Sequence, residues 1–217
     1  MLRKLHTVRE IASEIGVAAG RVEEAYREGD APYEVDITGR LLGAVVEQLD
    51  GRSIKGLKWR AKQFKTGRGS GAEEQKVGAD FMGVLDIDLE DYSAQKGFLV
   101  QAKRAEPNVP IDDWTRLTGQ LEKMLSISPA SFLFVYSKQR GIRAFPAISV
   151  LGLKSMNVFD LYDRSFERFF EEHLECFIGD RALTVPSIQA TLQGDVPAER
   201  VLFVGASDKT KSRLDKW

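Results

Sequence analysis

One cysteine, Cys176, is present among the 217 residues, so the chain cannot form an internal disulfide. This scarcity is typical of a reducing compartment, and we expect a cytoplasmic protein. The two histidines, His6 and His173, lie too far apart in sequence to suggest a metal-binding motif. No apolar run is long enough to span a membrane, and no apolar segment of a secretory signal follows the N-terminal MLRKLHTVRE.

An excess of charge of one sign is also missing. The formal net charge is -1, so the molecule as a whole does not attract a polyanion. Contact with nucleic acid must therefore depend on cations that cluster locally. Because 43% of the residues are hydrophobic, the chain can bury the core of one compact domain with a small appendage.

Hydrophobic periodicity predicts a mixture of helices and strands. We expect helices near 8–15, 38–50, 112–124 and 165–177, and strands near 79–88, 97–104, 131–137, 141–147 and 201–206. This order favours an α/β (α+β) fold in which a central mixed β-sheet is flanked by helices.

Residues 1–34 form the appendage in this interpretation, and residues 35–217 form the main domain. Apolar residues recur at helical spacing on either side of Gly16, which is expected to end a first helix. This spacing is typical of a helix-turn-helix. Glu23 and Glu24 are unfavourable in a helix that reads DNA, so we favour two helices packed on the main domain or on a second subunit over a helix-turn-helix.

The segment 51–72 is a long basic stretch of the chain. It contains aromatic residues and no acid, and its cations are suited to neutralising phosphates. They are Arg52, Lys55, Lys58, Arg60, Lys62, Lys65 and Arg68. We interpret the segment as a nucleic-acid-binding surface, with a solvated loop without a partner as the alternative.

Three polar residues stand out in the two strands that follow. Gln101 and Lys103 are two residues apart, so both side chains project from one face of a strand. The midpoint between Asp80 and Lys103 falls in the turn that separates the two strands. An antiparallel hairpin therefore places Asp80 beside Gln101 and Lys103. Asp86 and Asp88 share the face of Asp80 but lie nearer the turn.

This trio has the chemistry that phosphodiester hydrolysis requires. Mg²⁺ prefers oxygen ligands, which Asp80, Gln101 and the carbonyl of Ala102 can supply, and Mn²⁺ can substitute for it. Lys103 is then placed to orient a water molecule or to stabilise charge on the phosphate.

Over residues 38–147 the chain resembles the PD-(D/E)xK, or restriction-endonuclease-like, nuclease superfamily. The resemblance is carried by Asp80 in VGADF and by Gln101 and Lys103 in LVQAKR, where Gln101 replaces the usual Glu. It implies a Mg²⁺-dependent deoxyribonuclease, endonucleolytic by analogy, that acts in bacterial antiviral defence or DNA processing.

The resemblance also implies two further site residues. An acid from the preceding core helix matches Glu47, with Glu73 and Glu74 as rivals. A helical glutamine of the RecB-like branch matches Gln120, although Met124 stands where that branch has Tyr.

Two other functions remain open at this point. One is a catalytically silent nuclease fold that binds DNA, and the other is a helix-turn-helix regulator with a sensing domain. A homodimer and a gating partner protein are both compatible with the sequence, and no membrane partner is expected.

Overall fold

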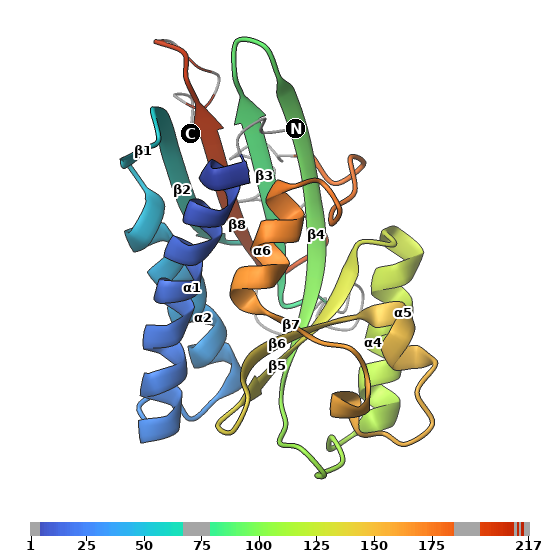
Figure 1. Cartoon of the computed structure of the whole chain (residues 1–217). Coiled ribbons are helices and arrows are strands. Elements are labelled where there is room, and N and C mark those ends of the chain that lie inside the picture. The colour runs from blue at the N-terminus through green and yellow to red at the C-terminus, as the bar shows by residue number, and fades with distance from the viewer. Residues whose placement is uncertain (1–4, 67–78, 185–195, 211, 213, 215–217) are drawn as a thin grey trace.

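The computed structural model describes residues 5–66, 79–184, 196–210, 212 and 214. It contains an eight-stranded mixed sheet in the order β1-β2-β8-β3-β4-β5-β6-β7, with helices on both faces (Figure 1). The expected fold class, a mixed sheet flanked by helices, is confirmed.

The helices are α1 (Leu5–Glu28), α2 (Glu34–Leu49), α4 (Trp114–Ile127), α5 (Ala147–Leu151) and α6 (Phe166–Leu174), with a 3-10 turn η1 (Val158–Asp160). The strands are β1 (Ser53–Ile54), β2 (Leu57–Lys65), β3 (Phe81–Asp88), β4 (Ser93–Arg104), β5 (Ser131–Ser137), β6 (Gly141–Pro146), β7 (Arg164–Ser165) and β8 (Arg200–Ser207). The strands expected near 79–88, 97–104, 131–137, 141–147 and 201–206 all form.

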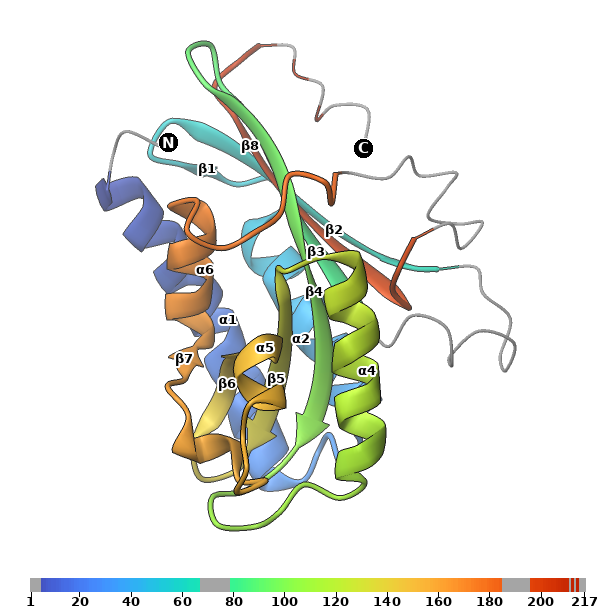
Figure 2. The ribbon, with the colours of Figure 1, turned by 90° about the vertical axis from the view of Figure 1, so that its right-hand side faces the viewer.

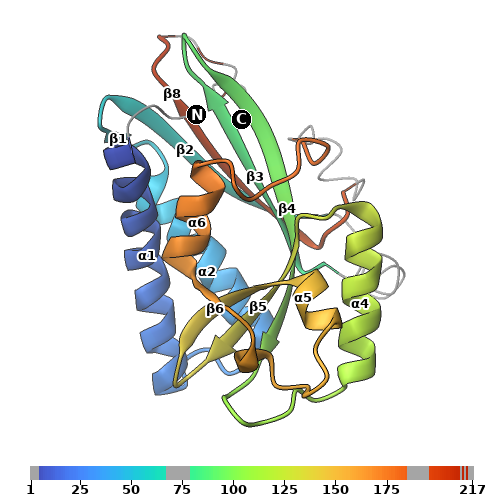
Figure 3. The same cartoon turned by 45° about the vertical axis from the view of Figure 1, so that its right-hand side comes forward.

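The sheet separates two layers of helices, as Figures 2 and 3 show. Helices α1, α2 and α6 lie on one face, and α4 and α5 lie on the other. Each layer buries its own apolar cluster against the sheet. In α4, Leu117, Leu121 and Met124 are buried, and Trp114 is half-buried against the same cluster. Burial of such stripes supplies most of the stability of amphipathic helices.

Strands β3 and β4 form the antiparallel hairpin that the sequence predicts, with Phe81 opposite Val100 and Asp88 opposite Ser93. The register differs by two residues from the predicted one, because the turn is centred between Glu90 and Asp91. Extending the ladder by one residue places Asp80 opposite Gln101.

Strand β8 lies between β2 and β3, parallel to β3 and antiparallel to β2. It therefore separates β2 from the hairpin that follows it in sequence. Its first residue, Arg200, pairs with Phe81 on one side and with Lys65 on the other. The beginning of β8 thus lies at the same end of the sheet as Asp80.

The predicted helix break at Gly16 is wrong. Helix α1 runs without interruption from Leu5 to Glu28, and so a helix-turn-helix does not form there. A Cβ on Gly16 would lie 2.8 Å from Oε2 and 3.0 Å from Cβ of Glu167, at the start of α6. The glycine lets α6 approach α1 closely, and this tertiary contact outweighs the cost of about 1 kcal/mol for glycine in a helix.

Helix α2 begins at Glu34 rather than near Thr38. Tyr33 is its N-cap residue, with extended backbone angles, and follows Pro32. Thr38 lies inside the helix, where its Oγ1 donates to the Glu34 carbonyl at 2.9 Å and contacts the Tyr136 hydroxyl at 2.8 Å. The earlier start brings an acidic residue to the first turn of α2.

In the part of the chain that the structure describes, no helix combines the length and the hydropathy that a membrane span requires.

The β3–β4 hairpin generates a stability prediction at Gly83. A Cβ at this position would lie 2.2 Å from Cζ of Phe98, a buried ring in edge contact with Phe81 and Phe169. We expect Gly83→Ala to lower the free energy of unfolding by roughly 2 kcal/mol or more, because the ring cannot move without disturbing its neighbours. Chemical denaturation measures this change.

Gly119 provides the matched control. It lies in α4, and a Cβ added there meets no atom within 4 Å. Gly119→Ala is expected to leave stability unchanged or to raise it by up to about 1 kcal/mol, since alanine favours helix. Equal effects of the two substitutions would contradict the packing described for Gly83.

Candidate functional site

The entry to β3 holds the carboxylate of Asp80 against the neighbouring strand. The backbone N–H of Asp80 donates to the Val100 carbonyl at 2.8 Å. Its Oδ2 accepts from the backbone N–H of Ala102 at 2.6 Å and from Nε2 of Gln101 at 2.7 Å. The hairpin therefore brings Asp80, Gln101 and Ala102 together, as the sequence predicts.

Burial dominates the electrostatics of Asp80. It raises the pKa of the carboxyl from 3.8 to about 7, and the nearby carboxylates of Glu199 and Glu34 raise the pKa further. The N–H of Ala102 and the charge of Lys103 act in the opposite direction. An ionised carboxylate is costly in such a place unless a cation compensates it.

Gln101 completes one side of the site. Its side chain is only 2% exposed, and the amide nitrogen also points to the Ala102 carbonyl at 3.3 Å. Its Oε1 is buried and accepts no hydrogen bond from the described residues. A buried acceptor without a donor is rare and costs about 1–3 kcal/mol. This oxygen is thus suited to accept a ligand.

Lys103 is oriented by the beginning of α2. Its Nζ lies 3.5 Å from Oε2 of Glu34, and Oε1 of Glu34 accepts from the backbone N–H of Arg104 at 3.1 Å. Arg104 also donates through its guanidinium to the carbonyl of Pro32. These contacts fix the N-terminus of α2 to the end of β4, so Glu34 and Lys103 border one site.

The helical acid at this site is Glu34, and the prediction of Glu47 is wrong in its position. Glu47 lies thirteen residues further along α2 and is exposed. At 1.5 Å per residue, roughly 20 Å of helix separates it from Glu34. The rival residues Glu73 and Glu74 lie outside the described residues.

Two residues that the sequence interpretation missed, Glu199 and Arg200, approach Asp80 from the beginning of β8. They line a cavity of about 40 Å³ together with Glu34, Val35, Thr38 and Asp80. A water molecule needs 10–15 Å³ on this scale, so the cavity has room for an ion and about one or two waters. Only the strand order reveals these residues, because they follow Asp80 by more than a hundred positions.

The donor set fits a hard divalent cation. It consists of oxygen atoms from the carboxylates of Asp80, Glu34 and Glu199, which line the cavity. Gln101, whose amide donates to Asp80, is not among the residues that line it. No group of three or more acidic, histidine or cysteine residues is close enough to hold a metal by itself within the described ranges. A cation in this cavity would therefore depend on water for part of its coordination, as Mg²⁺ commonly does.

Gln120 lies in α4, on the other side of β4 from α2. Its Oε1 is buried and accepts no hydrogen bond from the residues described. Among the described residues, no hydrogen bond links Gln120 to Asp80 or Gln101. Gln101 lies two residues from Leu99, whose side chain packs with α4, so Gln120 is on the same side of the sheet as Gln101.

Asp86 and Asp88 are separate from this site, as expected. Asp88 lies eight residues along β3 from Asp80, or roughly 26 Å at 3.3 Å per residue. It accepts from Lys209 and from Ser212, each at 2.7 Å, and Asp86 accepts from Gln95 at 2.9 Å. Both carboxylates are thus held by neighbouring side chains.

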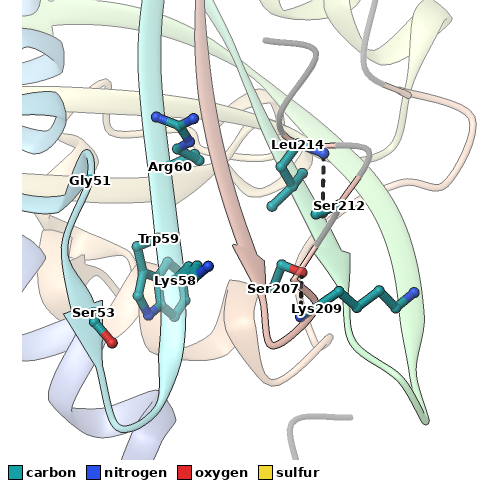
Figure 4. A pocket seen from close by; sticks show the side chains of 9 residues that line it. All are labelled: Gly51, Ser53, Lys58, Trp59, Arg60, Ser207, Lys209, Ser212 and Leu214. Atoms are coloured by element: carbon teal, nitrogen blue, oxygen red, sulfur yellow. Dashed lines mark hydrogen bonds between the residues drawn. The ribbon is translucent and has the colours of Figure 1, made fainter.

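A larger cavity of about 340 Å³ lies near Asp88, at the far end of β2 and β8. Figure 4 shows Lys58 and Arg60 on β2 and Ser207 and Lys209 on the side of β8. Its lining is basic and hydroxylated, whereas the smaller cavity at Asp80 is mainly acidic. The two cavities therefore differ in the ligands they can accept.

The structure divides the predicted basic surface. Arg52 pairs with Glu14 at 2.9 Å and Lys55 pairs with Glu10 at 3.0 Å, so these two cations hold β1 against α1. Three others, Lys58, Arg60 and Lys62, alternate along β2 and share one face of the sheet. Lys65 projects from the other face, and Arg68 lies outside the described residues.

Comparison with known proteins adds no assignment: no protein-family model, curated protein or solved structure matches the chain.

The raised pKa of Asp80 predicts how the stability of the metal-free protein depends on pH. Between about pH 4 and pH 7 the folded protein holds a proton that the unfolded chain releases, so the free energy of unfolding falls as the pH rises through this range. Asn at this position cannot ionise and can still accept from the N–H of Ala102. We expect Asp80→Asn to exceed the wild type in stability by roughly 2 kcal/mol at pH 8 and to match it near pH 4.

Urea denaturation at a series of pH values without divalent cations measures this difference. A destabilised Asp80→Asn protein at pH 8 would show that Asp80 serves as an ordinary structural residue.

Proposed function

We propose that the chain is a Mg²⁺-dependent nuclease that hydrolyses phosphodiester bonds in DNA at the site of Asp80, Gln101, Lys103 and Glu34. The observation that carries the proposal is the convergence of these side chains from β3, β4 and α2 on one end of the sheet. The resemblance to the PD-(D/E)xK superfamily supports the same chemistry. In that family the acid of the first strand and the (D/E)xK strand meet at such a place.

Each residue then has a defined part. Asp80, Glu34 and Gln101 would hold the cation through oxygen atoms. When bound, the cation supplies charge to neutralise the phosphate and to activate a water molecule. Lys103 Nζ, held by Glu34 at 3.5 Å, orients that water or donates to a phosphate oxygen. Glu34 is thus both an oxygen donor and the residue that positions Lys103.

Two features favour an active site over a silent nuclease fold. The buried Oε1 of Gln101 has no donor, and the carboxyl of Asp80 has a pKa raised to about 7. Both features cost stability in the absence of a ligand, and both are relieved by a cation. The regulator alternative loses its basis because α1 is one continuous helix.

The face of β2 that carries Lys58, Arg60 and Lys62 supports DNA as the substrate. These cations alternate with buried residues along a nine-residue strand that ends beside Arg200. A row of cations that leads toward the site can neutralise successive phosphates without reading sequence.

Substitutions at the site, compared with a substitution of Glu47 in the same helix as Glu34, test the proposal. We expect Glu34→Gln and Lys103→Met each to reduce Mg²⁺-dependent cleavage of DNA at least about a hundredfold, because each removes a group placed at the reacting phosphate. Glu47→Gln removes the same charge from the same helix roughly 20 Å away and is expected to retain wild-type cleavage. Single-turnover cleavage of linear and circular DNA is the measurement.

Loss of cleavage in Glu47→Gln with full activity in Glu34→Gln would reverse our placement of the helical acid. A wild-type protein that cleaves no DNA with either Mg²⁺ or Mn²⁺ would overturn the proposed activity.

Gln101→Glu tests the metal dependence. The added carboxylate gives the cation another charged ligand, so the Mg²⁺ concentration for half-maximal cleavage should fall about fivefold or more. Without metal, the substitution removes the Nε2 donor of Asp80 and adds a like charge beside it, which should destabilise the protein by roughly 1–2 kcal/mol. A Mg²⁺ titration of cleavage and a metal-free denaturation curve check both effects.

An unchanged Mg²⁺ requirement in Gln101→Glu would place the cation away from this side chain.

A further inference from the structure

Arg200 is a cation of the small cavity that neither the sequence motif nor the proposed mechanism uses. It is the first residue of β8 and is partly buried. A Cβ built on Gly39 of α2 would lie 3.7 Å from its Nη2 and 3.8 Å from both its Cζ and its Nη1. Such equal distances show that the guanidinium lies flat against α2. The helix therefore fixes its position beside the carboxylates.

The guanidinium has no ionic partner among the described residues. Glu34, Asp80 and Glu199 line the same cavity, yet none of their oxygens lies within ion-pair distance of it. Partly buried arginines are normally paired, because their N–H donors lose water on burial. The donors of Arg200 are thus available to an anion that approaches the cavity.

The charges of the site favour one such anion. Three carboxylates, from Glu34, Asp80 and Glu199, face two cations, Lys103 and Arg200. A divalent cation would change this formal balance from one negative charge to one positive charge. Over these five described residues, a single phosphodiester group would then bring the formal charge to zero. Arginine presents a planar pair of donors that matches two oxygens of a phosphate, whereas the Lys103 ammonium is already directed to Glu34.

We propose that Arg200 binds the non-bridging oxygens of the scissile phosphate and positions it against the cation site. This role rests on the proposed function. It gives a reason for the position of β8, which is inserted between β2 and β3 and brings to the site a residue that is far from the hairpin in sequence.

The affinities of protein variants for two DNA strands test this role. DNA binding is measured with Mg²⁺ in the Lys103→Met background, which keeps the oxygen ligands and slows turnover, and within a time too short for cleavage. Two strands are compared, one natural and one with a neutral methylphosphonate at the phosphate that the wild-type protein cleaves. We expect Arg200→Ala to weaken binding of the natural strand about 10–100-fold and to have less than about a threefold effect on the methylphosphonate strand. Arg200→Lys keeps the charge but loses the planar pair of N–H donors. Its affinity for the natural strand should lie between those of Arg200 and Arg200→Ala.

Arg40 supplies the control. It is an exposed cation of α2 next to Gly39, so Arg40→Ala removes the same charge at the same end of the molecule but outside the cavity. Its effect is expected to be small and equal for the two strands. Thermal unfolding of each variant distinguishes a lost contact from a lost fold.

The outcomes separate the two proposals. An equal loss for both strands in Arg200→Ala, in a protein whose wild type cleaves DNA, overturns the role of Arg200 and leaves the nuclease intact. A wild-type protein that neither cleaves nor binds DNA with Mg²⁺ or Mn²⁺ overturns both.

Discussion

The site depends on a carboxylate that is held at the entry of a strand where water reaches it poorly. Asp80 receives the Ala102 N–H at 2.6 Å and the Gln101 amide at 2.7 Å, but these donors do not offset the loss of water, and the pKa of the carboxyl is about 7. The register of the hairpin sets this arrangement. A shift of one residue would turn Gln101 and Lys103 to the opposite face. The remaining groups of the site are arranged around this carboxylate.

Three segments that are distant in sequence meet there. Helix α2 contributes Glu34 at its first residue, β4 contributes Lys103, and β8 contributes Glu199 and Arg200. The same fold keeps Asp88 apart by pairing it with Lys209 and Ser212 at the other end of β3. One end of the sheet is thus acidic with room for a cation, and the other end has a larger basic cavity. A phosphate backbone that runs along β2 would be attracted by cations before it reaches the acidic end.

The local part of this arrangement could be predicted from the sequence. The strand-like segments 79–88 and 97–104, separated by a polar turn, predict the hairpin, and the spacing of Gln101 and Lys103 predicts their common face. The position of Glu34 could not be predicted in the same way. Residues 29–34, which include Gly29 and Pro32, indicate a linker, whereas α2 already begins at Glu34. The helix break predicted at Gly16 is wrong for a related reason. Gly16 contacts Glu167, which lies on a helix far along the chain.

Arg200 illustrates what no local pattern contains. The sequence around Arg200 predicts a strand. The order of strands in a sheet, however, depends on how the whole chain packs. Strand β8 lies between β2 and β3, which precede it by more than a hundred residues. Similarly, the cations of 51–72 read as one surface in the sequence. Folding commits Arg52 and Lys55 to acids of α1 and leaves the alternating residues of β2 on a single face.

The most direct test of the account is to locate the divalent cation itself. In ¹⁵N-labelled protein titrated with substoichiometric Mn²⁺, paramagnetic broadening falls with the sixth power of the distance from the ion. Our account predicts that the amide signals of Glu34, Asp80 and Ala102 disappear first. The amides of Glu47 and Asp88, roughly 20 Å and 26 Å from the site, should keep their intensity. Broadening centred on Asp88, or spread evenly over the acidic surface, would contradict a cation site at Asp80.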